Sequence, residues 1–439
     1  MTDSALNDVS QAYRERVYRR NFPYFLADNI LFTLGMGVIG ATTVIPDFVR
    51  HLTDSEILIG LASSIFAIGF PLPQLFIARY IVGHANKKWW FVGPNIPVRF
   101  MMLIFAAIIV WLGKEQPQLI LLAFFVCYSI MALGDGLVGV PWADLTGTSL
   151  DNRWRARMFG TAAAVTGILM LIVAPLIGVV LGENGPEFPN NYAVLFGASG
   201  IIFALSILPG LFFHELPGGK AVEKIPPITE FLPDLGRVLR DDDPFRAYIF
   251  VRIFTSLFMM ADPFYIGFAT TKLGLSSAVA VPNLIAMLTI GSVGGALLYT
   301  WLGARNNLLY IQLALGTVVL LPICALLAEM VGPAVLYIGF LVAGLASGNN
   351  LFSCYINWLV GYSHPDQRPI YVGLSNTIAA VISIIAPVIG GMIAQYLGYR
   401  SLFVVSLMMM LCALFITLRW VPNTEAGENP EGTDMPAVL

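Results

Sequence analysis

Long runs of apolar residues, separated by short polar stretches, dominate this chain from residue 24 to residue 420. Each run has about 20 residues or more, which is the length that an α-helix needs to cross the hydrocarbon core of a bilayer. Lipid offers no partner to backbone polar groups, so such a segment forms a helix. The pattern predicts twelve transmembrane helices at residues 24–46, 57–82, 90–112, 117–142, 157–182, 192–212, 245–270, 277–302, 308–330, 333–361, 370–397 and 400–420.

The composition agrees with an integral membrane protein. Hydrophobic residues make up 57% of the chain and charged residues only 12%, whereas soluble proteins carry about 25% charged residues. The formal net charge of −3 provides no basic field for nucleic acid, so we expect none as a partner. The expected partners are the lipid bilayer and a small molecule.

The basic residues predict how the helices are oriented. Eighteen of the 24 Lys and Arg residues fall in the N-terminal segment or in loops on the same side of the predicted bundle. The opposite side holds only Arg50, Lys114, Lys272 and Arg400. Loops rich in Lys and Arg stay in the cytoplasm. We therefore expect a multi-pass protein of the cell (inner or plasma) membrane with both termini in the cytoplasm.

The two halves of the chain resemble each other, which indicates a duplicated six-helix unit. Three matches occur in the same order: Ala174-Pro175-Leu176-Ile177-Gly178 with Ala386-Pro387-Val388-Ile389-Gly390, Arg155 and Gly160 with Arg368 and Gly373, and Tyr192, Leu195 and Phe196 with Tyr399, Leu402 and Phe403. The predicted parts are a cytoplasmic N-terminal segment, a six-helix bundle, a cytoplasmic linker, a second six-helix bundle and a disordered cytoplasmic tail, at residues 1–21, 22–212, 213–244, 245–420 and 421–439.

Two local motifs resemble the major facilitator superfamily of transporters. Asp144-Leu145-Thr146, followed by Arg153 and Arg155, resembles the charged loop between helices 4 and 5 of that family. The segment from Ala386-Pro387 to Gly398-Tyr399-Arg400 resembles its passage from helix 11 to helix 12. The resemblance implies an all-α membrane protein with two pseudo-symmetric six-helix bundles and a cavity that opens to alternate sides.

Two family signatures are incomplete in this chain. The loop between helices 2 and 3 keeps only the closing basic pair, Lys87 and Lys88. The antiporter-type signature of helix 5 is partly matched by Ala174-Pro175-Leu176-Ile177-Gly178-Val179, with Gly167 upstream. This partial match favours export.

Three acidic residues inside predicted helices are candidates for substrate or ion binding. A charge at the centre of a membrane helix costs about 2.5–3.5 kcal/mol on insertion scales, so it is a functional hypothesis by default. Asp28, beside Asn29, either faces the central cavity or is an interfacial carboxylate near a helix N-terminus. Asp135 lies deep in helix 4, where it either binds an ion or makes a helix–helix hydrogen bond. Asp262 precedes Pro263, which predicts a bend in helix 7; the alternative is a carboxylate near the outer interface.

Further polar residues complete the candidate site. Asn349 and Asn350 in helix 10 are near the repeat counterpart of Asp135, which favours a site at the midplane between the repeats. Arg99 is a candidate counter-charge or anion anchor. Arg252 is another, but the simpler interpretation is a side chain that snorkels to the cytoplasmic interface.

The candidates for a cytoplasmic gate are Lys87, Lys88, Asp144, Arg153, Arg155 and Arg368. The resemblance implies that such residues latch the two halves together when the cavity opens outward. The alternative is a solvated basic loop that only sets topology, because exposed ion pairs contribute about 0–1 kcal/mol.

The predicted function is secondary active transport by alternating access. No catalytic set, P-loop or metal-ligand spacing occurs, so we expect a monomeric non-enzyme without cofactor or metal. A carboxylate that pairs with Arg and then loses the pair in a dry site takes up a proton. We therefore expect proton-coupled export of small amphipathic compounds. Cation-coupled uptake of a nutrient such as a sugar, and a non-transporting receptor or sensor with a transporter-like fold, are the alternatives.

Overall fold

The computed structural model describes residues 3–74, 87–215, 239–298, 302, 306–346, 349–363 and 368–423. This part of the chain is almost entirely helical and contains no strand. An all-helical fold is what a chain of long apolar runs requires, since a helix pairs its backbone groups internally.

The N-terminal lobe comprises the described residues up to 215. Its helices are α1 (Asp3–Ile39), α2 (Val44–Arg50), α3 (Glu56–Gly69), α5 (Lys88–Arg99), α6 (Met101–Leu112), η1 (Gly113–Glu115), α7 (Pro117–Ser149), α8 (Asn152–Leu181) and α9 (Asn190–Leu211). The first helix begins at Asp3, before the expected start at residue 24. The expected helix 90–112 is divided at Phe100 into α5 and α6.

The C-terminal lobe comprises the described residues from 239 to 423. Its helices are α11 (Asp243–Phe258), η2 (Met259–Ala261), α12 (Phe264–Thr271), α13 (Ser277–Leu298), α14 (Asn307–Val331), α15 (Pro333–Gly344), α16 (Asn349–Tyr362) and α17 (Arg368–Arg419). Most of the predicted linker 213–244 and of the predicted tail 421–439 lies outside the described residues.

Ten helical segments of the described chain are long and apolar enough to cross a membrane. The expected helix 333–361 is divided into α15 and α16, and α15 is apolar but shorter than a span. The expected helices 370–397 and 400–420 run together as α17, with a kink at Gly398 (φ 81°, ψ 167°). The all-helical membrane fold is thus confirmed, and the number twelve stays a prediction.

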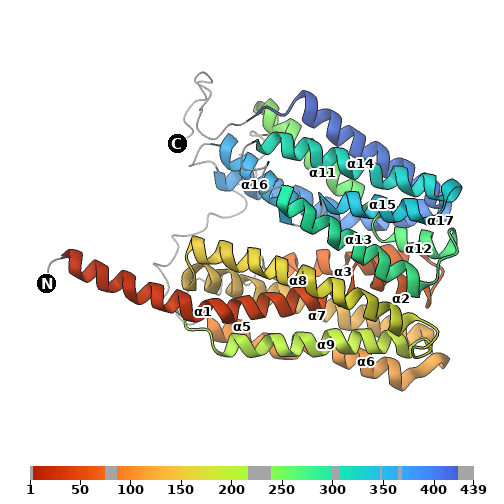
Figure 1. The fold of residues 1–439 in the computed structure, drawn as a ribbon, viewed down its shortest axis with the longest axis horizontal. Helices are drawn as coiled ribbons and strands as arrows, with labels where there is room; N and C mark the ends of the chain where they lie inside the picture. The colour runs from red at the N-terminus through yellow and green to blue at the C-terminus, as the bar shows by residue number, and fades with distance from the viewer. Residues whose placement is uncertain are drawn as a thin grey trace.

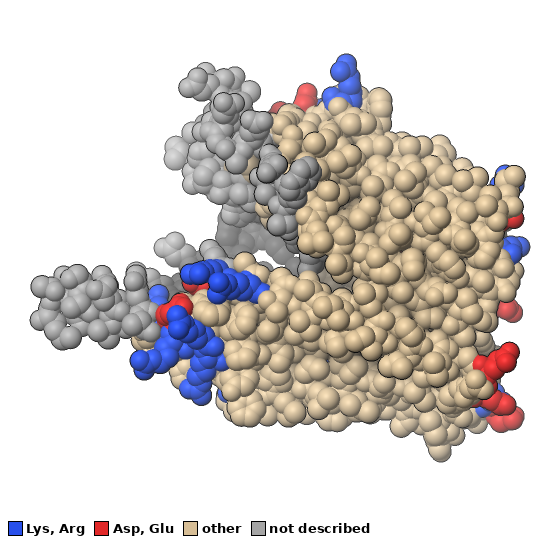
Figure 2. All heavy atoms as spheres, in the orientation of Figure 1, with Lys and Arg blue, Asp and Glu red and all other residues tan. Residues whose placement is uncertain are grey.

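The two lobes lie side by side with their helices roughly parallel (Figure 1). Both chain ends lie at the left in this view, and we call this side the termini end and the opposite side the far end. In the space-filling view the lobes meet towards the far end and diverge towards the termini end (Figure 2). In this view the largest group of blue Lys and Arg side chains lies at the termini end, and red Asp and Glu side chains occur at both ends.

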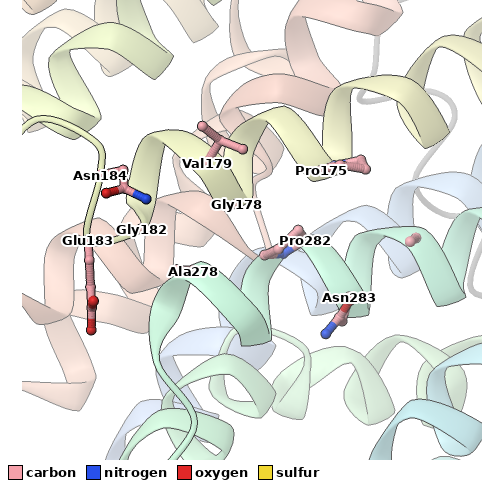
Figure 3. A pocket seen from close by; sticks show the side chains of 10 residues that line it. Pro175, Gly178, Val179, Gly182, Glu183, Asn184, Ala278, Pro282 and Asn283 are labelled. Carbon is pink, nitrogen blue, oxygen red and sulfur yellow. The ribbon is translucent and has the colours of Figure 1, made fainter.

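The lobes contact each other through α3 and α17, and through α8 and α13. A Cβ atom added to Gly60 of α3 would lie 2.2 Å from the carbonyl oxygen of Pro387 in α17. A Cβ atom on Gly178 of α8 would lie 3.0 Å from the carbonyl oxygen of Ala278, at the start of α13. Figure 3 shows Pro175 and Gly178 opposite Pro282. The repeated motif that contains Gly178 and Pro387 thus supplies the close contact between the lobes in both halves.

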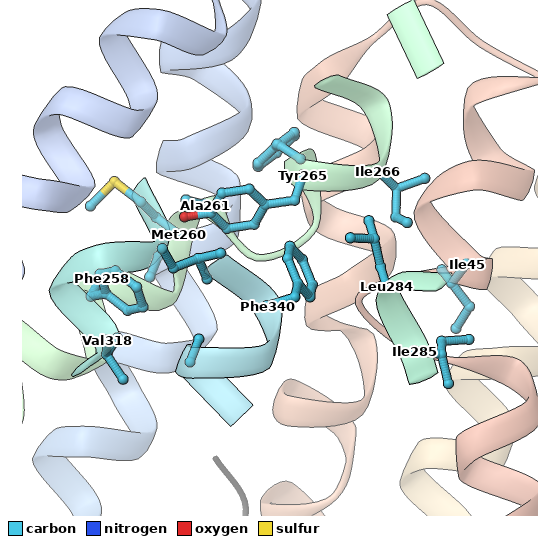
Figure 4. Close-up of a cluster of buried hydrophobic side chains, with 14 of the residues drawn as sticks. Ile45, Phe258, Met260, Ala261, Tyr265, Ile266, Leu284, Ile285, Val318 and Phe340 are labelled. Carbon is cyan, nitrogen blue, oxygen red and sulfur yellow. The ribbon is translucent and has the colours of Figure 1, made fainter. Parts of the chain in front are cut away.

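Apolar side chains continue across this contact. Ile45 of α2 belongs to the same buried cluster as Leu284 and Ile285 of α13, and Figure 4 shows these side chains next to one another. Tyr265 and Phe340 extend the cluster into the C-terminal lobe, with ring centres 5.4 Å apart. Apolar packing therefore connects the two lobes where α2 meets α13.

Candidate functional site

A cavity of about 870 Å³ lies between the lobes. The N-terminal lobe contributes Thr42, Phe70 and Gln74 to its wall, and the C-terminal lobe contributes the rest. The wall is mostly apolar or aromatic, and its polar side chains are Thr42, Gln74, Arg252, Thr255, Ser256, Asp262, Tyr265, Tyr355, Asn376 and Ser383. Its size and lining suit a small amphipathic molecule, because ligand pockets of about 300–1,000 Å³ are typically apolar with a few polar groups.

Arg252 of α11 is the one Arg or Lys in the described wall of this cavity. Its guanidinium carbon lies 4.7 Å from the ring centre of Tyr355 in α16. One terminal nitrogen, Nη2, lies 3.5 Å from Oδ1 of Asn376 in α17, and buried Nε has no hydrogen-bond partner among the described residues. The ring of Tyr355 and the amide of Asn376 hold the guanidinium group on the cavity wall. The sequence had favoured a position at the membrane interface instead.

Asp262 also lines the cavity, at the predicted bend of helix 7. The α-helical part of α11 ends at Phe258, one 3₁₀ turn follows, and α12 begins after Pro263. Asp262 has no ion pair within the described chain. Its role as a binding residue stays a prediction.

A second set of charged residues is buried inside the N-terminal lobe. Arg99, at the end of α5, forms an ion pair with Asp135 of α7, with Nη1 and Oδ1 3.3 Å apart and side-chain exposures of 5% and 2%. Asp28 of α1 accepts a hydrogen bond of 2.8 Å from Nε1 of Trp142 in α7, and it interacts electrostatically with Arg99. One guanidinium is thus shared by two carboxyl groups, and we call Asp28, Arg99 and Asp135 the charge cluster.

The glycines on both sides of Asp135 bring these helices together. A Cβ atom on Gly134 would lie 2.1 Å from Cγ2 of Val98, the residue before Arg99. A Cβ atom on Gly136 would lie 2.1 Å from the carbonyl oxygen of Phe70. Gly134 thus permits the close approach of α7 to α5, which carries Arg99. The glycines therefore pack this segment closely, and the role of Asp135 in ion binding stays a prediction.

The charge cluster leaves hydrogen-bonding capacity unused. Among the described residues, Oδ1 of Asp28, Nε of Arg99 and both carboxyl oxygens of Asp135 have no hydrogen-bond partner. The amide of Asn95, one turn before Arg99, is also buried without a partner in that part of the chain. Sequence reasoning missed Asn95 and Trp142, although a polar side chain one helical turn from an intramembrane Arg is a usable signal. Asn29 is half-buried on α1 beside Asp28.

Polar residues join the lobes at the far end, and sequence reasoning missed most of them. Arg50 and Glu56 form a two-fold ion pair with N–O distances of 2.6 and 2.8 Å. Tyr399 of the other lobe donates a hydrogen bond of 2.5 Å to Glu56. Ser277 donates one of 3.0 Å to Asp47. These five residues form the far-end cluster, and the hydrogen bonds of Tyr399 and Ser277 cross from lobe to lobe.

The gate candidates at the termini end make their recorded contacts inside the N-terminal lobe. Lys87 Nζ lies 2.5 Å from Oδ2 of Asp144, and Lys88 Nζ donates to the carbonyl oxygen of Leu211. Arg155 donates to the carbonyl oxygen of Gly147, and Arg153 is exposed. The structure thus brings together the two loops of the resemblance, and the ion pair of Lys87 with Asp144 and the hydrogen bond of Lys88 both lie within the N-terminal lobe.

Three candidates from the C-terminal lobe lie where side chains are not described. Asn349 and Asn350 begin α16, and Arg368 begins α17. Their backbone belongs to the described helices, but their side chains lie outside the described part. The predicted roles of all three stay predictions.

The profile of the Major Facilitator Superfamily matches residues 29–355 and 313–439 of this chain. A stretch of 68 residues is 25% identical to the riboflavin transporter RibZ of Clostridioides difficile (strain 630). That stretch covers 16% of this chain and spans about 15% of the length of RibZ.

Solved transporter structures share the fold of this chain. The nucleoside transporter NupG is 14% identical, with coverage of 90% of this chain and 98% of that chain and a TM-score of 0.64. A D-xylose-proton symporter is 13% identical, with coverage of 92% and 98% and a TM-score of 0.68. A bacterial homologue of the iron transporter ferroportin, in an inward-facing state, is 14% identical, with coverage of 92% and 98% and a TM-score of 0.66.

Proposed function

Because this chain belongs to the major facilitator superfamily, we propose that it is a proton-coupled exporter of small amphipathic compounds. The observation that carries the proposal is the separation of two polar sites. The charge cluster is buried in the N-terminal lobe, and the cavity is walled mainly by the C-terminal lobe. One lobe then handles the proton and the other handles most of the substrate.

Charge balance supports a proton site at the charge cluster. The guanidinium of Arg99 neutralises one carboxylate, so two ionised carboxyl groups would leave one negative charge in a buried site. An uncompensated buried charge is costly, and a carboxyl group relieves that cost by binding a proton. Asp28 and Asp135 therefore share one exchangeable proton. Proton binding weakens the ion pair between Arg99 and Asp135. In the proposed cycle α5 then moves relative to α7, and the other helices of the lobe move with it.

The contacts between the lobes support alternating access. With the termini in the cytoplasm, as the distribution of Lys and Arg indicates, this conformation is closed to the outside by the far-end cluster and its packed core. Opening to the outside requires the hydrogen bonds of Glu56 with Tyr399 and of Asp47 with Ser277 to break. The lobes then close at the cytoplasmic end, where Lys87, Lys88, Asp144, Arg153, Arg155 and Arg368 are the proposed latch.

The wall of the cavity supports an amphipathic substrate. Phe70, Tyr265, Phe340 and Tyr355 contribute aromatic surface, and single amide and hydroxyl groups are interspersed among apolar side chains. Apolar burial of a compound in such a wall is favourable by about 25 cal/mol per Å² of apolar surface. Export is the direction that the partial helix 5 signature favours.

The test measures proton movement in liposomes that contain the purified chain and a trapped pH-sensitive dye. A panel of phenylalkanoic acids, with their amides and amines, is offered with the pH gradient imposed in either direction. We expect a substrate to move against the proton, as exchange requires. Asp135→Asn should lower proton-driven flux by about tenfold or more, because each 1.4 kcal/mol of lost coupling is a factor of ten. Exchange without a gradient should persist.

The matched control is Asp54→Asn, in the exposed loop between α2 and α3, which should leave proton-driven flux unchanged. Movement of substrate together with the proton would overturn export and support uptake by symport. Full proton-driven flux in both Asp135→Asn and Asp28→Asn would overturn the charge cluster as the proton site.

A further inference from the structure

The charge of Arg252 has no acidic partner in the described C-terminal lobe. The described part of that lobe contains five acidic residues, Asp241, Asp242, Asp243, Asp262 and Glu329. None of the five forms an ion pair with Arg252. The described cavity wall from the N-terminal lobe adds no acid. Arg252 differs in this respect from Arg99, whose guanidinium has a carboxylate beside it.

The acids nearest in sequence are occupied or remote. Asp242 accepts hydrogen bonds from the hydroxyl groups of Tyr362 (2.6 Å) and Tyr371 (2.8 Å). Asp243 pairs with the partly exposed Arg246. Asp262 follows Arg252 by ten residues and lies beyond the end of α11 at Phe258 and the 3₁₀ turn after it. None of these three acids forms an ion pair with Arg252 in this conformation.

The surroundings of Arg252 orient it for a ligand. Tyr355 stacks on its guanidinium at 4.7 Å, and Asn376 is within 3.5 Å of one terminal nitrogen. Nε of Arg252 is buried and has no hydrogen-bond acceptor among the described residues. A planar guanidinium held in this way presents a pair of parallel N–H donors, which matches the two oxygens of a carboxylate.

We propose that Arg252 binds the carboxylate of an amphipathic organic acid, whose apolar body lies along the aromatic wall of the cavity. The inference rests on the proposed function, because it names the substrate class of the same cavity. Arg252 is the one basic side chain of the described wall and Asp262 its one acid, so the carboxylate of the ligand is placed at Arg252 and away from Asp262. The aromatic residues Phe70, Tyr265 and Phe340 line the wall that receives the rest of the molecule.

The test is a binding measurement on the full chain in detergent, without any gradient. The probes are 4-phenylbutanoate, its primary amide and the corresponding amine. We expect the acid to bind about tenfold more tightly than the amide, because a charge-assisted bidentate pair replaces a neutral hydrogen bond. Arg252→Gln should abolish this difference. Arg252→Lys should restore part of it, because Lys keeps the charge but lacks the pair of parallel N–H donors.

Arg246→Gln is the matched control, since Arg246 lies on the same helix and its partner is the exposed Asp243. It should leave the preference for the acid unchanged. Equal affinity for acid and amide, preference for the amine, or full acid preference in Arg252→Gln would each overturn the inference. So would tighter binding of dodecyl phosphate than of the acid, which would identify a site for lipid headgroups.

The two proposals fail in different ways. The Arg252-dependent preference for the acid is measured without a gradient, because binding needs no proton cycle. If that preference holds while liposomes show no proton-coupled movement of the acid, the exporter proposal is overturned and the binding site stands. If proton-coupled export proceeds only with amides or amines, the binding site is overturned and the exporter proposal stands.

Discussion

Arg99 and Arg252 are intramembrane arginines in opposite lobes, and their surroundings differ. Arg99 has a carboxylate 3.3 Å away and is 5% exposed, and two aromatic rings, Phe32 and Phe203, lie over its guanidinium. Arg252 also has an aromatic ring against it but lies on a cavity wall. It has no acidic partner in the described chain. The difference is that the charge of Arg99 is compensated inside the protein, whereas that of Arg252 is compensated by no described acid.

The largest expected effect is a difference in stability between Arg99→Ala and Arg252→Ala. Arg99→Ala should cost about 3–5 kcal/mol, because it leaves two carboxyl groups buried without a counter-charge. Arg252→Ala should cost less than about 1 kcal/mol, because it removes a charge that no acid compensates. The measurement is the melting temperature of the purified chain in detergent.

A double variant separates charge from size. Arg99→Met combined with Asp135→Leu should recover most of the stability lost in Arg99→Ala, since apolar replacement of a buried pair is often neutral. Equal drops in melting temperature for Arg99→Ala and Arg252→Ala would contradict the distinction between a paired and an unpaired charge.

A smaller effect is expected where the lobes meet. Gly60→Ala should force α3 away from α17, because the new Cβ atom would lie 2.2 Å from the backbone oxygen of Pro387. Overpacking of this kind costs about 1–3 kcal/mol. We expect a longer distance between spin labels at Asp54→Cys and Lys272→Cys, which lie on opposite lobes at the far end.

Gly373→Ala is the control for this experiment. Nothing lies within 4 Å of a Cβ atom at Gly373, so the label distance should not change. The labels require a chain without its native cysteines, Cys127, Cys324, Cys354 and Cys412. An unchanged distance in Gly60→Ala would mean that the lobes do not separate at this contact.

The smallest effect is expected from a single hydroxyl group. Tyr399→Phe removes the 2.5 Å hydrogen bond to Glu56 across the far end, worth about 1–2 kcal/mol in the closed state because the acceptor is charged. The same label pair should show a minor population at longer distance. Tyr396→Phe is the matched control, because Tyr396 is 74% exposed. A shift as large in Tyr396→Phe would contradict a specific role for Tyr399.

Much of the fold followed from local patterns. The apolar runs predicted helices, and the all-helical membrane fold and the family are confirmed. Pro263 predicted the bend that the structure has between η2 and α12. The repeated motif around Pro175 and Pro387 predicted two related halves, and both copies contribute to the contact between the lobes. The departures from the expected spans are the early start of α1, the helices divided at Phe100 and after Gly344, and the continuous α17.

The candidate site was predictable as a set of residues but not as an arrangement. Asp28, Arg99, Asp135 and Asp262 were identifiable because a charge in an apolar run is costly. Their partners were not identifiable from the sequence, because each contact joins two helices. Arg99 of α5 pairs with Asp135 of α7, and Asp28 of α1 accepts a hydrogen bond from Trp142 of α7. The far-end cluster and the place of Arg252 on the cavity wall were missed for the same reason.

The sequence by itself determined which segments are helices, where they bend and which end of the bundle is basic, because these follow from each segment's own contact with lipid, water and backbone. Only the tertiary structure decided which charges are paired, which one faces a cavity and which end is closed. Those outcomes depend on how closely helices approach, and glycines such as Gly60 and Gly136 set that distance against residues far away in the chain.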